Sequence, residues 1–307
     1  MQARGPIARG GGAATYFDTE PQSADPIKRL IMNRKETGRF ILWVSVPLAL
    51  LVAVTAGAGL FWAPTYAQET PLWAMEGIGG DGVNLLLVVP VLLVSAIKAQ
   101  RGSIAARLVW MGVLLYLLYS FVLYTFAVHF NPLFLVYCAV LGFSFYAVVG
   151  SVPELPVEEI SQSYVSRTPV KTVALVFFLI AAVTAAGWLR EIIPALLAGR
   201  VPQSARDAGL LTNPVHVLDL SLLLPGLVIT AILLLRRKSV AFVLAPALIA
   251  FLILMSCELV GIGVAMVAKG FSSNFAMPAF FSALAVGLAL LLWRYLRSEN
   301  PPPRARV

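Results

Sequence analysis

Eight long apolar segments, separated by short polar stretches, dominate the chain after its first 39 residues. They lie at approximately 40–63, 83–98, 104–129, 132–151, 170–189, 214–235, 239–268 and 275–295. Most reach the ~20 residues that a helix needs to cross a hydrocarbon core of ~30 Å at 1.5 Å per residue. None shows the ten-residue alternation of polar and apolar positions found in membrane β-strands. The pattern predicts an all-α, polytopic membrane bundle of eight transmembrane helices.

The polar stretches divide this chain into regions. We expect residues 1–39 to be a tail, disordered to about residue 25 and juxtamembrane after it, because Gly, Pro and charged residues occur there without periodicity. Helices one to four occupy 40–151 and helices five to eight occupy 170–295, with a loop over 152–169 between them and a tail over 296–307. Two further loops, 64–82 and 190–213, are too short for a soluble domain. The second of these could hold an interfacial helix.

Composition agrees with a surface that faces lipid. The chain is 59% hydrophobic and only 12% charged, whereas soluble domains carry roughly 25% charged residues. Its net charge of +8 would suggest nucleic acid in a soluble protein, but in an eight-span protein we expect the bilayer as partner and no nucleic acid. The run Gly77–Gly82 precedes an apolar segment rather than following a strand, so it does not indicate a nucleotide site. We expect no cofactor.

The placement of the basic residues predicts the orientation. With the N-terminus in the cytoplasm, 19 of the 23 basic residues fall on the cytoplasmic side; the exceptions are Arg190, Arg200, Arg206 and Lys269. Cytoplasmic loops of membrane proteins carry such an excess of Lys and Arg. We therefore expect both termini in the cytoplasm, and the usage of Ala, Gly, Leu, Val and Arg favours the inner membrane of a bacterium.

The two halves of the chain resemble each other at an offset of 135 residues. This offset aligns Asn84 with Asp219, Pro90 with Pro225 and Arg101 with Arg236. Four helices per half would give two halves of the same orientation, as in transporters with parallel repeats. Apolar helices also match by chance, because they draw on few residue types. A 4+4 internal repeat is thus a hypothesis.

A few polar side chains lie within the apolar segments, where an ionisable group costs at least ~2.5–3.5 kcal/mol on insertion scales. They are His216 and Asp219 in the sixth segment and Glu258 in the seventh, together with Asn84 in the second. Asp219 and Glu258 should both lie in the outer half of the membrane on neighbouring helices. Arg190, at the outer end of the fifth segment, could pair with Asp219 or bind an anionic solute, although an arginine that extends to the membrane interface is the simpler explanation.

Three kinds of site fit these residues. The two carboxylates and the imidazole could pass protons or bind a cation, as they do in transporters. They could also be structural, with a protonated carboxyl group bonded between helices. His216, Asp219 and Glu258 could together ligate a metal, but the chain has only two histidines, and no metal is expected. Tyr116, Tyr119 and Tyr124 could line a ligand cavity or pack within the bundle.

The leading functional hypothesis is a transporter or channel for a small solute, a cation or protons that uses the intramembrane carboxylates. One alternative is an intramembrane enzyme with an acid–base or metal site at the same residues. Another is a non-catalytic subunit that packs against a partner protein, and a homo-oligomer is compatible with each of these. No sequence motif of a characterised enzyme family decides among them.

Overall fold

The computed structural model describes residues 26–165, 168–271 and 274–297, and every regular element in these ranges is helical. The α-helices are α1 (Pro26–Phe61), α2 (Pro71–Val83), α3 (Val89–Gln100), α4 (Ile104–Ala127), α5 (Phe134–Ser151), α6 (Val157–Tyr164), α7 (Val170–Leu197), α8 (Gln203–Asp207), α9 (Pro214–Leu218), α10 (Leu224–Leu235), α11 (Ala241–Ala268) and α12 (Ala276–Leu296). They form eight spans long and apolar enough to cross a membrane. The chain is thus an all-α, multispan membrane protein, as predicted. The tail to residue 25, predicted to be disordered, lies outside the described residues.

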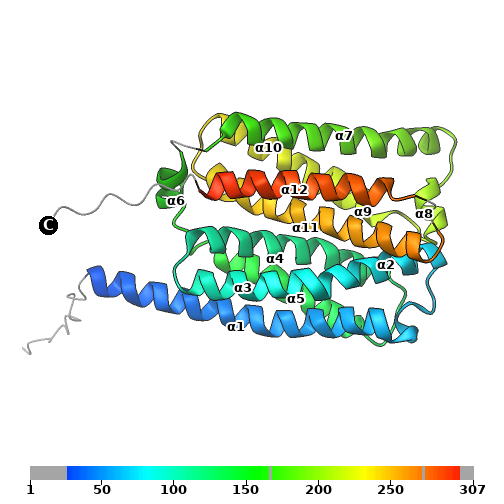
Figure 1. Cartoon of the computed structure of the whole chain (residues 1–307), viewed down its shortest axis with the longest axis horizontal. Coiled ribbons are helices and arrows are strands. Elements are labelled where there is room, and N and C mark those ends of the chain that lie inside the picture. The colour runs from blue at the N-terminus through cyan, green and yellow to red at the C-terminus, as the bar shows by residue number, and fades with distance from the viewer. Residues whose placement is uncertain (1–25, 166–167, 272–273, 298–307) are drawn as a thin grey trace, which may run out of the picture.

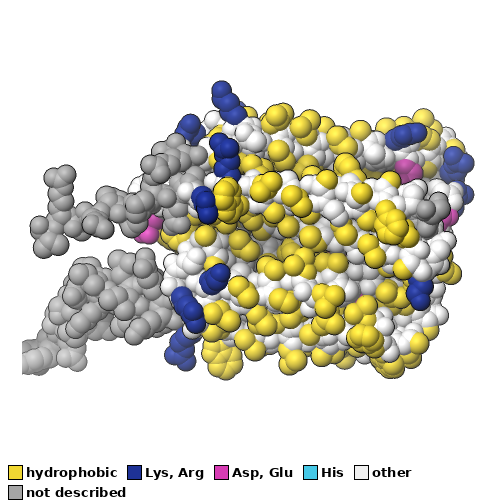
Figure 2. All heavy atoms as spheres, in the orientation of Figure 1, with side chains coloured by type: hydrophobic (Ala, Val, Ile, Leu, Met, Phe, Trp, Pro, Cys, Tyr) yellow, Lys and Arg dark blue, Asp and Glu magenta, His cyan; other side chains and the backbone are white. Residues whose placement is uncertain are grey.

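The spans run side by side along one axis, with the described chain ends at the same end of the bundle (Figure 1). Helices α4 and α11 pack against each other and form the centre. Of their most apolar windows 67% and 61% is buried inside the protein, against 11% for α12. On the face shown in Figure 2, charged side chains lie at the two ends, and the band between them carries none. Such a band is what a lipid core requires.

The second span begins earlier than predicted. We placed its start near residue 83, but α2 begins at Pro71, where Thr70 caps the helix by accepting a hydrogen bond from the Trp73 backbone N–H. The segment predicted as a long outer loop, 64–82, is therefore mostly helix. The error has a physical reason: Glu76, Asp81 and several glycines lower the local hydropathy, although the helix buries much of this polar face inside the bundle.

The glycines of α2 permit close contact between helices. A Cβ atom added at Gly79 would lie 2.4 Å from the Ile262 Cα, and one added at Gly261 would lie 2.6 Å from the Gly79 carbonyl oxygen. Small residues at such crossings let two backbones approach, which is a main source of helix association in lipid. Gly79 and Gly261 thus form a packing contact between α2 and α11, and the run Gly77–Gly82 lies in a helix rather than in a loop.

Two other loops contain helices that the sequence analysis did not predict. The fifth span continues through Pro194 to Leu197, so the proposed interfacial helix after Arg190 is wrong over most of its length, and α8 follows it. The loop predicted over 152–169 contains α6. These additions leave the order of the eight spans unchanged.

A short π-helical turn interrupts the second span at Asn84–Val88 and the sixth span at Asp219–Leu223. In both spans the turn begins at the polar residue and is followed by a proline, Pro90 or Pro225. Within α-helices, π-helical turns are uncommon and are often associated with functional sites. They widen the helix where Asn84 and Asp219 point into the bundle, since both side chains are buried.

Candidate functional site

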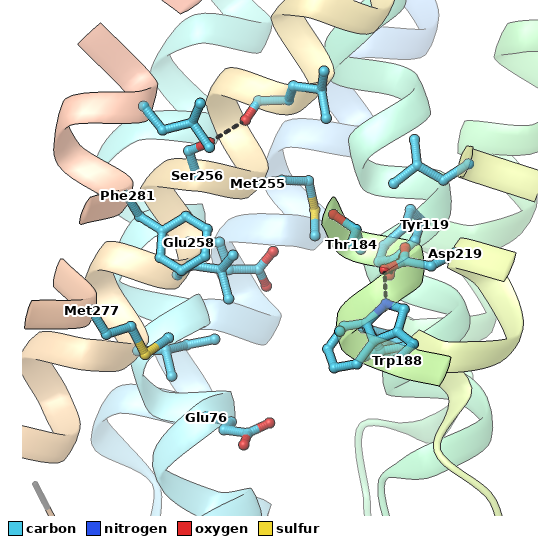
Figure 3. Close-up of a pocket in the computed structure, with 18 of the residues that line it drawn as sticks. Glu76, Tyr119, Thr184, Trp188, Asp219, Met255, Ser256, Glu258, Met277 and Phe281 are labelled. Carbon is cyan, nitrogen blue, oxygen red and sulfur yellow. Dashed lines mark hydrogen bonds between the residues drawn. The ribbon is translucent and has the colours of Figure 1, made fainter. Parts of the chain in front are cut away.

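A cavity of about 490 Å³ lies among α2, α4, α7, α11, α12 and the sixth span. Its wall is mainly apolar and aromatic, with polar side chains at Glu76, Tyr119, Thr184, Asp219, Ser256 and Glu258. In Figure 3, Glu76 and Glu258 lie on one side, and Asp219 lies across the cavity beside Trp188. Ligand cavities in proteins typically measure 300–1,000 Å³ and combine an apolar wall with a few polar groups.

Asp219 is held at the edge of this cavity by two donors from different helices. The Tyr119 hydroxyl group of α4 donates to Oδ1 at 2.9 Å, and the Trp188 indole N–H of α7 donates to Oδ2 at 2.8 Å. The residue lies five positions after the start of α9, hence roughly 8 Å from that end of the span at 1.5 Å per residue. Its side chain is buried. The two donors fix the carboxyl group while it still borders the cavity.

His216 supports Asp219 indirectly. Its ring packs against the Trp188 ring with centroids 4.5 Å apart, and its Nε2 lies 3.8 Å from Glu191 Oε2. It is buried and is not among the residues that line the cavity. His216 therefore contacts Trp188, the residue that donates to Asp219, without reaching the cavity. Arg190 is exposed, about two turns before the end of α7. The partners that the structure gives Asp219 are Tyr119 and Trp188, so an Arg190–Asp219 ion pair is not formed.

Glu258 lies on the opposite wall and has an unpaired oxygen. Its side chain is only 8% exposed, and Oε2 has no hydrogen-bond partner. The other oxygen lies close to the backbone of α2, since a Cβ atom at Gly80 would be 3.0 Å from Oε1. The carboxyl group points into the cavity (Figure 3). A buried polar oxygen without a partner is costly, and because Glu258 borders the cavity, a proton or a ligand there would offset this cost.

A further buried carboxyl group, absent from the sequence-based site, lies behind this wall. Asp81 is 1% exposed and accepts hydrogen bonds from the Tyr66 hydroxyl at 2.5 Å and the Tyr124 hydroxyl at 2.7 Å. Burial raises the pKa of the Tyr66 phenol well above its usual range, so this group stays protonated and donates. Asp81 thus has a donor on each carboxyl oxygen, whereas Glu258 Oε2 has none.

Asn84 does not line the cavity either. Its Oδ1 accepts a hydrogen bond of 2.9 Å from the Tyr116 hydroxyl, and both residues are fully buried. The tyrosines of α4 thus have two roles: Tyr116 packs in the core, whereas Tyr119 and Tyr124 reach the cavity as well as their carboxyl partners. His129, the other histidine, is exposed at the surface and lies 3.0 Å from Glu69.

The geometry does not support the metal alternative. Among the described residues, no group of three His, Cys, Asp or Glu side chains is arranged to hold a metal ion. The reason is visible in the contacts: His216 turns toward Trp188 and Glu191, away from the space between Asp219 and Glu258. Those two residues do line one cavity, but His216 does not join them.

Sequence reasoning missed Glu76, Asp81 and the cavity role of Trp188. A start signal for α2 was present in Thr70-Pro71, because a threonine cap followed by proline is typical of a helix N-terminus. Extending the span to that point would have placed both carboxyl groups inside the membrane. Trp188, by contrast, falls near the outer end of its predicted span, where indole rings commonly lie at the membrane interface.

Comparison of the chain with models of protein families, with curated proteins and with solved structures finds no match.

Proposed function

We propose that this protein carries a small solute, a cation or protons across the membrane, with Asp219 and Glu258 as the groups that bind the cation or the proton. The observation that carries the proposal is that both carboxyl groups border one cavity inside the bundle, and that Glu258 Oε2 has no partner there. Intramembrane carboxyl groups of transporters commonly serve in this way.

The charges around the cavity favour a positive ligand. Glu76, Asp219 and Glu258 line it, and no Lys, Arg or His is among its described lining residues. A carboxylate in such surroundings needs a cation beside it, or else it carries a proton. Exchange between these two states would couple ligand binding to proton movement. The cavity lies toward the end of the bundle opposite the chain ends, since α2 and α9 begin there (Figure 1).

The predicted orientation and repeat extend this proposal. With both termini in the cytoplasm, the cavity lies in the half of the membrane that faces away from the cytoplasm, where it would receive solute from outside the cell membrane. The two π-helical turns lie 135 residues apart, which is the offset of the sequence resemblance and supports a 4+4 repeat. The helix contacts also support a repeat. The third span, α4, contacts α9 of the sixth span, and the seventh span, α11, contacts α2 of the second span.

The test measures charge movement in proteoliposomes on a solid-supported membrane, after concentration jumps of H⁺, Na⁺, K⁺ and benzylammonium. We expect the purified protein to give a transient current with at least one of these cations. Asp219→Asn and Glu258→Gln should each abolish the current, because each removes a charge without changing the shape of the side chain.

The matched control is the double variant Glu158→Gln, Glu159→Gln, which removes two negative charges from exposed positions of α6. It should behave like the unmodified protein. Currents that persist in the Asp219 and Glu258 variants, or no current with any of the four cations, would overturn the proposal. Size-exclusion profiles of all variants verify that the fold is intact.

A further inference from the structure

We infer that the ligand of the cavity is a monovalent organic cation with an apolar, ring-bearing body, rather than a bare metal ion. This inference rests on the proposed function and specifies its substrate class. It combines three features of the cavity: its size, the nature of its wall and the position of its charged groups.

The size of the cavity argues against an inorganic ion alone. A volume of about 490 Å³ is that of a site for a small organic molecule. A bare alkali or alkaline-earth cation would need several oxygen ligands in one shell of about 2–3 Å. The described residues offer no compact group of three ligating carboxylate, imidazole or thiolate side chains. A bound inorganic ion would therefore keep most of its water inside a mainly apolar cavity.

The wall suits an apolar body. Trp73 and Tyr124 are aromatic residues of the cavity lining. Trp188 and Phe281 add further aromatic surface, and Met255 and Met277 add thioether groups (Figure 3). Aromatic faces attract organic cations by about 0.5–2 kcal/mol each. Methionine side chains adapt to ligands of irregular shape. A neutral ligand would gain from the same apolar contacts but would leave the carboxyl groups uncompensated.

The charged groups fix where the positive charge would lie. Glu258 Oε2 is unpaired, more than nine-tenths buried and directed into the cavity. Asp219 faces the same space from the other wall and uses its two donors on separate oxygens. A diffuse organic cation between the two walls would contact both carboxyl groups without the strict geometry that a metal ion demands. Protons would compete with it for the same oxygens.

The test is equilibrium binding of tetraphenylphosphonium to the full-length protein in detergent, compared with the neutral triphenylphosphine oxide. We expect the cation to bind at least roughly tenfold more tightly, the factor that corresponds to about 1.4 kcal/mol. Glu258→Gln combined with Asp219→Asn should weaken binding of the cation by at least that factor and leave the neutral compound unchanged. Lowering the pH should weaken binding of the cation to the unmodified protein.

Two results would overturn the inference: equal affinity for the two probes, or unchanged affinity of the double variant for the cation. If either occurs while the currents with inorganic cations still depend on Asp219 and Glu258, only the substrate class is wrong. If the preference for the cation and the dependence of the currents on Asp219 and Glu258 are both lost, the proposed function is wrong as well. The Glu158→Gln, Glu159→Gln variant serves again as the control, and it should bind tetraphenylphosphonium like the unmodified protein.

Discussion

Two pairs of buried polar residues, 135 positions apart in the sequence, have different surroundings in the two halves of the bundle. In the first half, Asp81 and Asn84 are 1% exposed and receive their hydrogen bonds from tyrosines of the core. In the second half, the positions 135 residues later are His216 and Asp219, and Asp219 borders the cavity. Asp81 and Asn84 are thus enclosed by the protein, whereas Asp219 borders the cavity, as Glu76 of the first half also does.

Packing of the outer helices accounts for the difference. In the first half, α1 and α5 pack closely against each other. The corresponding pair in the second half, α7 and α12, is absent from the close helix pairs of the described chain, and both helices instead line the cavity. The cavity thus borders two helices, α7 and α12, that do not pack closely against each other. The predictions below test this contrast.

The largest effect is expected at the contact between α2 and α11, which joins the two halves of the bundle. Gly79→Val would place a branched side chain where a Cβ atom is already 2.4 Å from the Ile262 backbone, so α2 and α11 would have to separate. Overpacking of this kind typically costs about 1–3 kcal/mol or more. Thermal unfolding in detergent, followed by tryptophan fluorescence, should show a large fall in midpoint. Gly82→Val is the matched control, because a Cβ atom there meets nothing within 4 Å; equal effects of the two variants would refute the close contact.

The second prediction contrasts two tyrosines of α4 that are three residues apart. Tyr116→Phe leaves Asn84 Oδ1 without its donor in a fully buried place, which should cost about 1–3 kcal/mol of stability. Tyr119→Phe leaves Asp219 with Trp188 and with access to the cavity, where water or ligand can replace the lost hydroxyl. Its stability should fall less, while its binding of tetraphenylphosphonium changes more. The reverse order in both measurements would contradict the proposed division of roles.

The third prediction fills the cavity. Thr184→Phe extends a side chain of α7 toward the space between Asp219 and Glu258 (Figure 3). Binding of tetraphenylphosphonium should weaken by roughly tenfold, or about 1.4 kcal/mol, with little change in thermal stability because the volume is empty of side chains. Val183→Phe is the control, since Val183 is 68% exposed. If the control weakens binding as much as Thr184→Phe, the wall has been assigned to the wrong face of α7.

Eight spans could be predicted from sequence because hydropathy is a local property, summed over ~20 residues. Asp219 and Glu258 could be identified for the same reason, as ionisable residues inside apolar runs. The start of α2 could not be predicted in this way, because the partners of its polar face lie far away in sequence. Tyr124, which donates to Asp81, lies 43 residues from it, and Gly261 packs against Gly79. Such pairings depend on the assembled bundle, which a local pattern does not contain.

The smallest effect is expected at Gly226, on the loosely packed side of the second half. The position 135 residues earlier is Val91, and a Cβ atom added at Gly226 meets nothing within 4 Å. Gly226→Ala should therefore raise stability, by up to about 0.5–1 kcal/mol from reduced backbone freedom. Gly263→Ala, where the new Cβ atom would lie 2.7 Å from the Pro278 ring, should lower it. Opposite shifts of the unfolding midpoint would show that the second half holds free space beside α10 while its α11–α12 contact is tight. A loss of stability at Gly226 would instead mean that this half is packed as closely as the first.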